Sequence, residues 1–251
     1  DWGTAKTLGT GLLADATKRG FDVAYEQSSG RAMIVVRSGA DIKYWIWDGA
    51  SWVVDGVVYD LTVTSGNPVW ISLASDPLSD EIALIWIDHT YDVGGAIWSG
   101  SAWGSQVLLD GTQVTSEMIG KECIAVEYMA SNGKAMFAWG ADLKPTASDS
   151  GIGGRVWNGA SWDAVQYITY AAGRNSYPPY WLSLKPNPNS NELMLAVTDD
   201  DSDFGTIRWS GTAWDSVVEH STGIETETSR CADVEWETAT GHAGHAIATW
   251  N

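Results

Sequence analysis

The chain has 251 residues, of which 44% are hydrophobic, and its 16 tryptophans supply ample material for a packed core. Its formal net charge of −18 argues against nucleic acid and anionic membrane surfaces as partners, because both recruit clusters of Lys and Arg. No apolar run approaches the roughly 20 residues of a membrane span, so we expect no membrane insertion.

A six-residue signature recurs along the chain: Trp, a short polar residue, Gly, two small residues and a second Trp. A polar residue followed by Gly is typical of a two-residue hairpin turn, and the two Trp rings can pair across the strands. Trp2 stands in the frame of a second Trp, and the period of about fifty residues predicts an array of small β-sheets. The four copies span residues 47–52, 98–103, 157–162 and 209–214.

Two further strand-like segments precede each signature, and a fifth pair of such segments follows the last signature. The alternating segments are 23–25, 70–73, 125–128, 181–184 and 233–236. The strongly apolar segments are 33–36, 82–87, 135–139, 193–197 and 246–250. Four short strands per unit, with no helical periodicity, predict an all-β fold: a single domain forming a five-bladed β-propeller. We place blade 1 at about residues 20–66, blade 2 at 67–119, blade 3 at 120–177, blade 4 at 178–229, and blade 5 at 230–251 with 1–10.

The fifth blade lacks about a dozen residues, roughly one strand with its turn. The N-terminal segment matches the outer strand that follows each Trp pair, so we expect the N- and C-terminal strands to close an incomplete, composite fifth blade. A vacant slot would remain, which the chain beyond Asn251, direct three-stranded pairing or a neighbouring molecule could fill. A six-bladed ring or an open array in a longer protein also fits. The residues expected to mediate assembly there are Trp2, Thr4, Lys6, Leu8, Ile247, Thr249 and Trp250.

The segments between strands carry a family resemblance. Residues 25–32 (Tyr-Glu-Gln-Ser-Ser-Gly-Arg-Ala) and 75–81 (Ser-Asp-Pro-Leu-Ser-Asp-Glu) resemble Trp-rich propeller-type repeats of large secreted bacterial and archaeal proteins. The resemblance extends over essentially the whole chain. It implies an extracellular or cell-surface location and several copies of the unit, and it carries over no catalytic residue.

The loop at residues 199–205 holds the densest acidic cluster. Asp199, Asp201 and Asp203 alternate along it and could supply hard oxygen ligands, so we predict a Ca²⁺ site, the only cofactor that the sequence suggests. A solvated turn is the alternative. Cys123 and Cys231 occupy the same position in blades three and five, which predicts a disulfide across the channel mouth. Two buried thiols are the alternative there.

Acidic residues also lie on or beside the first strands, which line the channel of a propeller: Asp22, Glu26, Glu127, Asp233, Glu235 and Glu237. Alternation places Asp22 and Asp233 on one face, and Glu127 and Glu235 on the opposite one. No spacing selects a catalytic pair, so we expect no enzyme. Trp70 and Trp181 lie outside the repeated Trp pair and are predicted to be exposed platforms on which glycans stack.

These observations together favour a non-enzymatic, extracellular interaction module. We expect self-association by β-strand addition at the open fifth blade, giving a cell-surface or filamentous assembly. The alternative is a multivalent lectin whose partner is a glycan. The sequence identifies no particular ligand.

Overall fold

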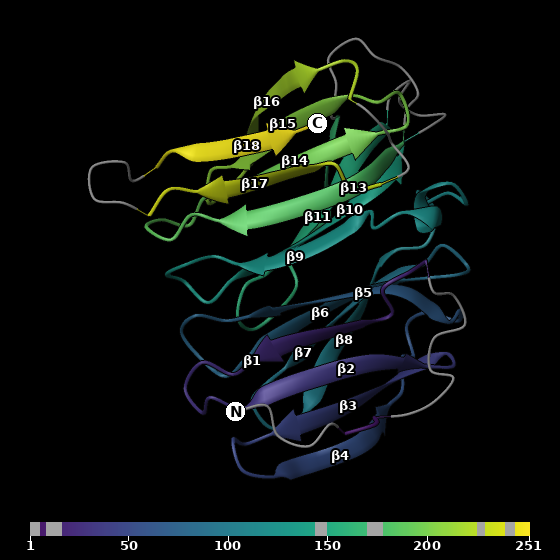
Figure 1. Ribbon diagram of the computed structural model, residues 1–251, viewed down its shortest axis with the longest axis vertical. Coiled ribbons are helices and arrows are strands. Elements are labelled where there is room, and N and C mark those ends of the chain that lie inside the picture. Colours follow the sequence, from purple (N-terminus) through teal and green to yellow (C-terminus); the bar gives the residue numbers. More distant parts are fainter. Residues whose placement is uncertain (1–5, 9–16, 144–149, 170–177, 225–228, 239–243) are drawn as a thin grey trace.

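The computed structural model describes the chain except residues 1–5, 9–16, 144–149, 170–177, 225–228 and 239–243 (Figure 1). The described residues form β-strands and one short 3-10 turn, η1 (Met118–Gly120), so the fold is all-β, as predicted. Within these residues no helix has the length and apolar character that crossing a membrane requires.

The strands form five antiparallel sheets, which we number 1 to 5 in chain order. Sheet 1 holds β1 (Phe21–Tyr25), β2 (Ala32–Ser38), β3 (Asp41–Trp47) and β4 (Trp52–Tyr59). Sheet 2 holds β5 (Pro68–Ser75), β6 (Ile82–Asp88), β7 (Val93–Trp98) and β8 (Trp103–Asp110). Sheet 3 holds β9 (Ile124–Tyr128), β10 (Ala135–Asp142), β11 (Ser150–Trp157) and β12 (Gln166–Thr169). Sheet 4 holds β13 (Pro179–Pro186), β14 (Leu193–Asp199), β15 (Phe204–Trp209) and β16 (Trp214–Ser221); sheet 5 holds β17 (Ala232–Trp236) and β18 (Ala246–Trp250).

The Trp signature forms the predicted hairpin between the third and fourth strands of each complete sheet. Gly49, Gly100, Gly159 and Gly211 all have positive φ, from 85° to 96°, which this tight turn requires. Within each signature the two Trp rings pair across the strands, with centroids 5.4 to 5.7 Å apart. The regular Trp pair is therefore a structural element of every complete sheet.

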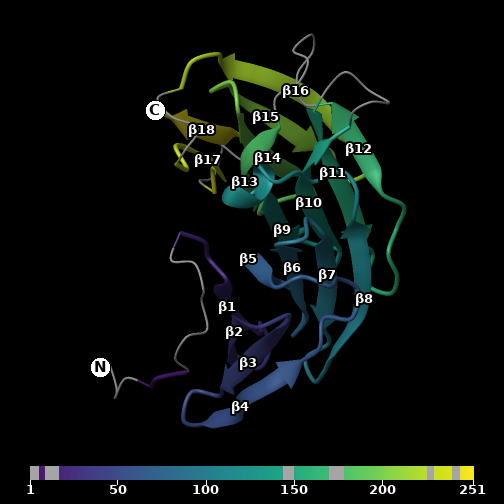
Figure 2. The same cartoon turned by 90° about the vertical axis from the view of Figure 1, so that its right-hand side faces the viewer.

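Successive sheets pack face to face in a curved row (Figure 2). Their first strands, β1, β5, β9, β13 and β17, lie on the concave side and are neighbours in that order. One apolar cluster fills each space between consecutive sheets. Trp86 of sheet 2 and Trp139 of sheet 3 are fully buried in these layers. Burial of such aromatic faces is the main source of cohesion between sheets.

A buried carboxylate ties the first turn of sheet 1 to sheet 2. Glu26, which is 1% exposed, accepts hydrogen bonds from Arg31 Nη2 (2.8 Å) and from Trp98 Nε1 (2.6 Å). Arg31 Nη2 also donates to the Gly100 carbonyl oxygen at 2.7 Å. The fully partnered charge fixes the spacing of the two sheets, because a buried carboxylate is tolerated only when its oxygens are satisfied.

The fifth sheet differs from the predicted composite blade. Its two C-terminal strands form as expected, but the N-terminal segment is not paired with β18 among the described residues. Lys6 Nζ instead lies 2.8 Å from Asp55 Oδ2 on β4 and 4.7 Å from the Trp52 ring centroid. The N-terminal segment at Lys6 thus lies against sheet 1, held by a charge pair and a cation–π contact. Trp2 and Thr4 lie outside the described residues, and the blade count of five stays a prediction.

Candidate functional site

The two tryptophans predicted as exposed glycan platforms are packed together. The ring centroids of Trp70 and Trp181 are 6.0 Å apart in an edge-to-face arrangement. Trp70 is 4% exposed, and its Nε1 donates to the Ile119 carbonyl oxygen at 3.0 Å. The prediction is wrong for Trp70, because the loop carrying η1 covers the ring that the sequence pattern left unassigned.

Asp199 shapes the 199–205 loop as a turn, and the Ca²⁺ site there stays a prediction. Asp199 Oδ1 accepts the backbone N–H groups of Asp201 (3.1 Å) and Asp203 (3.0 Å), the arrangement of an Asx turn. Burial is the main cause that raises the pKa of Asp199 to about 7. In the part of the chain that the structure describes, no three acidic, His or Cys side chains are placed to hold a metal ion. The carboxylates thus shape the turn between β14 and β15.

The two cysteines are not joined by a disulfide. Cys123 precedes β9 and is buried, whereas Cys231 precedes β17 and is partly exposed. The two positions are equivalent, as the sequence indicated, but β13 lies between β9 and β17. Equivalent positions in alternate sheets are therefore separated by the strand of the intervening sheet.

Several paired charged residues lie on or beside the first strands, on the concave side. Arg19 Nη1 lies 3.0 Å from Asp22 Oδ1, and Arg19 also pairs with Glu122 of the next sheet but one. Asp22 Oδ2 accepts the Leu73 N–H at 2.8 Å, which links β1 to β5. We call the surface formed by the concave side of the first strands and the adjoining outward face of sheet 5 the axial site; its residues are Arg19, Asp22, Ser72, Glu122, Glu127, Ser183, Lys185, Arg230, Asp233, Thr249 and Asn251.

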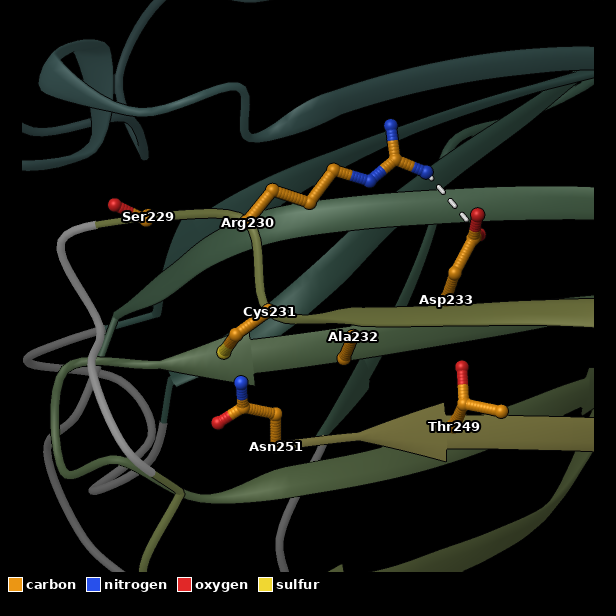
Figure 3. A pocket seen from close by; sticks show the side chains of 7 residues that line it. All are labelled: Ser229, Arg230, Cys231, Ala232, Asp233, Thr249 and Asn251. Carbon is orange, nitrogen blue, oxygen red and sulfur yellow. Dashed lines mark hydrogen bonds and ion pairs between the residues drawn. The ribbon is translucent and has the colours of Figure 1, made fainter.

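The same arrangement recurs at the other end of the row (Figure 3). Arg230 Nη2 lies 3.1 Å from Asp233 Oδ1 and donates to Ser183 Oγ at 2.9 Å. Ser183 Oγ in turn donates to Asp233 Oδ1 at 2.5 Å. Burial alone would raise the pKa of Asp233, but the Ser183 hydrogen bond, the Val234 N–H and the Arg230 charge hold it below its usual range.

A carboxyl group of different character lies at the centre of the axial site. Burial raises the pKa of Glu127 on β9 to about 7, against the attraction of Lys185 and with the repulsion of Glu235 and Asp22. Lys185 Nζ lies 3.8 Å from Glu235 Oε2, so that lysine is shared between two carboxylates. Glu127 therefore carries a proton over much of the range below neutral pH, while Asp233 is ionised.

Two hollows open on this surface and share Arg230. The smaller, of about 110 Å³, lies over β9 and β13 and is lined by Glu122, Glu127 and Ser183. The larger, of about 420 Å³, lies over the outward face of β17 and β18. Figure 3 shows Arg230, Asp233, Thr249 and Asn251 pointing to the same side of that sheet. Guanidinium and amide donors, carboxylate acceptors and hydroxyl groups thus lie around one hollow.

The sequence indicated half of this site. The acidic residues of the first strands were expected near the channel, and Asp22 and Glu127 lie there. Arg19, Arg230 and Lys185 were not singled out. A signal for two of them was present, because an arginine stands three residues before the aspartate in both Arg19–Asp22 and Arg230–Asp233.

Comparison with known proteins supports the fold. No protein-family model and no curated protein matches the sequence. The structure resembles the BP39L lectin from Burkholderia pseudomallei with a TM-score of 0.61 at 9% identity, over 89% of this chain and 62% of that chain. It resembles the fungal lectin from Aleuria aurantia, described as a six-bladed β-propeller with a novel fucose recognition mode, with a TM-score of 0.50 at 14% identity, over 77% and 57%.

An enzyme is also among the similar structures. The NanB sialidase from Streptococcus pneumoniae matches with a TM-score of 0.49 at 16% identity, over 78% of this chain and 29% of that chain. This chain thus spans about three fifths of the length of the lectin chains that it matches. At these identities the likeness shows the fold alone, and the sheets correspond to blades of a β-propeller.

Proposed function

We propose that this chain is a non-catalytic, extracellular carbohydrate-binding module and that the axial site holds the glycan. One observation carries the proposal: Arg230, Ser183 and Asp233 are hydrogen-bonded to one another where two open hollows meet at Arg230. The propeller fold shared with the BP39L and Aleuria aurantia lectins supports it, and the latter is described as recognising fucose.

The chemistry of the hollow suits a polyhydroxylated ligand. A sugar hydroxyl donates one hydrogen bond and accepts others, so it fits between a carboxylate and a guanidinium group. Asp233 supplies the acceptor, Arg230 the fixed fork of donors, and Thr249 and Asn251 further partners on the same side. A volume of about 420 Å³ lies within the range of sites that take small ligands.

The test is titration of free mono- and oligosaccharides, selected on a glycan array, into the full chain by calorimetry. We expect Asp233→Asn to weaken binding at least about tenfold, because a charged acceptor in a ligand contact contributes roughly 1.5–3 kcal/mol. Asp215→Asn is the matched control, since Asp215 lies on β16, the outer strand of sheet 4, and pairs there with Arg208 of β15. Absence of glycan binding, or equal loss in both variants, contradicts the proposal.

The glycan identified by this titration also serves to test the enzyme alternative. Glu127, with a pKa of about 7, and Asp233, with a lowered pKa, differ in acidity, as the two carboxyl groups of acid–base catalysis do, and they line separate hollows. Incubation of the bound glycan with the protein, followed by product analysis, is expected to give no cleavage. Turnover that is lost in Glu127→Gln would replace binding by hydrolysis as the function.

Assembly through sheet 5 is a second candidate function. It is favoured by the pairing of β18 with β17 alone within the described residues, whereas the other four sheets have four strands. An open strand edge is a template for β-strand addition. Sedimentation across a range of protein concentrations is expected to show self-association, and a single monomeric species at all concentrations contradicts it.

A further inference from the structure

Within sheet 2, and again within sheet 3, a tryptophan on the second strand packs closely against a glycine on the third strand. Trp86 on β6 lies opposite Gly94 on β7, and Trp139 on β10 lies opposite Gly153 on β11. A Cβ atom added to Gly94 or Gly153 would lie 2.1 Å or 2.2 Å from the facing indole ring, closer than Cβ atoms approach other atoms. Both rings are 0% exposed. A third strand that covers such a tryptophan therefore needs glycine at this position.

The third strands also end alike. In β7 a tryptophan follows four residues after Gly94, and in β11 one follows four residues after Gly153. β15 repeats the spacing with Gly205 and Trp209, so all three third strands of sheets 2 to 4 read Gly-x-x-x-Trp. In sheet 3 this second tryptophan, Trp157, lies 3.4 Å from Glu81 Oε2 of the preceding sheet.

Sheet 5 carries the same tryptophan without the strand that would cover it. Trp250 is the fifth residue of its apolar segment, as Trp86 and Trp139 are of theirs. Its ring packs on Phe204 and His220 of sheet 4, with centroid distances of 5.0 and 5.6 Å. It is nevertheless 44% exposed, because no third strand lies beside β18 among the described residues.

A hollow of about 300 Å³ continues from the edge of β18 over sheet 4. Its β18 side is formed by the small side chains of Ala246 and Ala248, together with Trp250. Thr206 and His220, which are hydrogen-bonded at 2.8 Å, line the opposite side. Small residues on β18 leave room for larger side chains of an added strand, in the alternation that antiparallel pairing imposes.

We propose that the open edge of β18 binds an extended partner strand of sequence Gly-x-x-x-Trp, with its glycine opposite Trp250 and its tryptophan opposite Ala246. The inference concerns the same open edge as the second candidate function, and it goes beyond that function by naming the chemistry of the strand that binds there. Glu192, which aligns with Glu81, is placed to accept the indole N–H of the incoming tryptophan. Backbone pairing supplies affinity, and the glycine supplies specificity.

The partner strand lies outside residues 1–251. The chain contains four Gly-x-x-x-Trp segments, beginning at Gly66, Gly94, Gly153 and Gly205. Three of them already form third strands, and Gly66–Trp70 leads into β5. None is left to pair with β18.

The test uses two synthetic peptides and the full chain. The first peptide is Asp-Phe-Gly-Thr-Ile-Arg-Trp, the sequence of residues 203–209, and the second replaces its glycine with valine. We expect the first to bind and to protect the amides of residues 246–250 from hydrogen exchange. The valine peptide should bind at least about tenfold more weakly, because overpacking costs roughly 1–3 kcal/mol.

Substitution of Trp250 tests whether the discrimination between the two peptides depends on its indole ring. In Trp250→Ala the indole is absent, so the discrimination between the two peptides is expected to fall below about threefold. Val217→Ala is the control, since Val217 is an exposed residue on β16, outside the axial site and sheet 5, and it should keep the full discrimination. If Trp250→Ala does not fold, as judged by circular dichroism, Trp250→Phe takes its place and should reduce the discrimination in part.

The possible outcomes distinguish the assignment of a Gly-x-x-x-Trp partner strand from self-association between copies of this chain. Equal binding of both peptides to the unmodified chain, no binding, or protection outside residues 246–250 overturns the partner assignment. Self-association in sedimentation without peptide binding leaves assembly standing and overturns the assignment alone. Peptide binding by a strictly monomeric protein supports the assignment and removes assembly between copies of this chain.

Discussion

Replacing Glu127 by Gln is expected to stabilise the protein above neutral pH and not below pH 4. The folded carboxyl keeps its proton up to a pKa of about 7, mainly because of burial, whereas in the unfolded chain it titrates near 4.5. Between these values the unfolded state binds fewer protons, so the free energy of unfolding falls as the pH rises. Above pH 7 the protein with Glu127 has lost this part of its free energy of unfolding in full. Glutamine does not ionise, so the Glu127→Gln variant does not undergo this loss.

The size of the effect follows from the two pKa values. A rise from 4.5 to about 7 corresponds to about 3 kcal/mol, because each tenfold change in proton affinity is worth about 1.4 kcal/mol. Urea unfolding of both proteins from pH 4 to pH 8.5 measures it. The two curves should coincide at the acid end and separate by up to about 3 kcal/mol at pH 8.5. Asp199 titrates over the same range in both, so it cancels in the difference.

Glu117→Gln is the matched control, because Glu117 is an exposed carboxylate just before η1, outside the axial site, and makes no side-chain cap hydrogen bond there. It should change stability by less than about 0.5 kcal/mol at any pH. A constant difference between Glu127→Gln and the parent at all pH values would show that the substitution alters packing and not ionisation. The raised pKa, and with it the buried setting of Glu127, would then be refuted.

Two further substitutions and one chemical probe examine the packing. Gly153→Ala places a Cβ 2.2 Å from the Trp139 ring and should cost about 1–3 kcal/mol or more in chemical denaturation, whereas Gly104→Ala, with nothing within 4 Å, should cost little. Equal costs would contradict the described contact. Burial raises the pKa of Cys123 to about 12, so a thiol reagent should label only Cys231 in the folded protein and both cysteines in urea. Rapid labelling of both in the folded state would show that β9 is not covered.

The repeat pattern determined the local structure. A polar residue and glycine between two tryptophans can only turn tightly, and the positive φ of Gly49 and its counterparts shows that turn. The spacing of the apolar segments then gave the strands and their order in each sheet, because antiparallel neighbours joined by short turns must pair. These features depend on residues close in sequence, which a single chain displays directly.

The candidate site residues could not be placed from the sequence, because their exposure and contacts depend on distances between different sheets, which the repeat pattern does not contain. Trp70 was expected at the surface, yet the connection between sheets 2 and 3, which carries η1, covers it. Cys123 and Cys231 have equivalent positions, but an intervening strand keeps them from meeting. Lys6 was assigned to the last blade, and its charge pair with Asp55 holds it against the first.

The sequence by itself therefore determined the sheets, their hairpins and the acidic character of the concave strands. Only the tertiary structure decided that Arg230 meets Ser183, forty-seven residues away, and that Trp250 lies uncovered beside an open edge. The physical reason is that strand pairing follows from local alternation and turns, whereas the meeting of charged groups and the covering of a ring depend on how successive sheets are rotated about a common concave side.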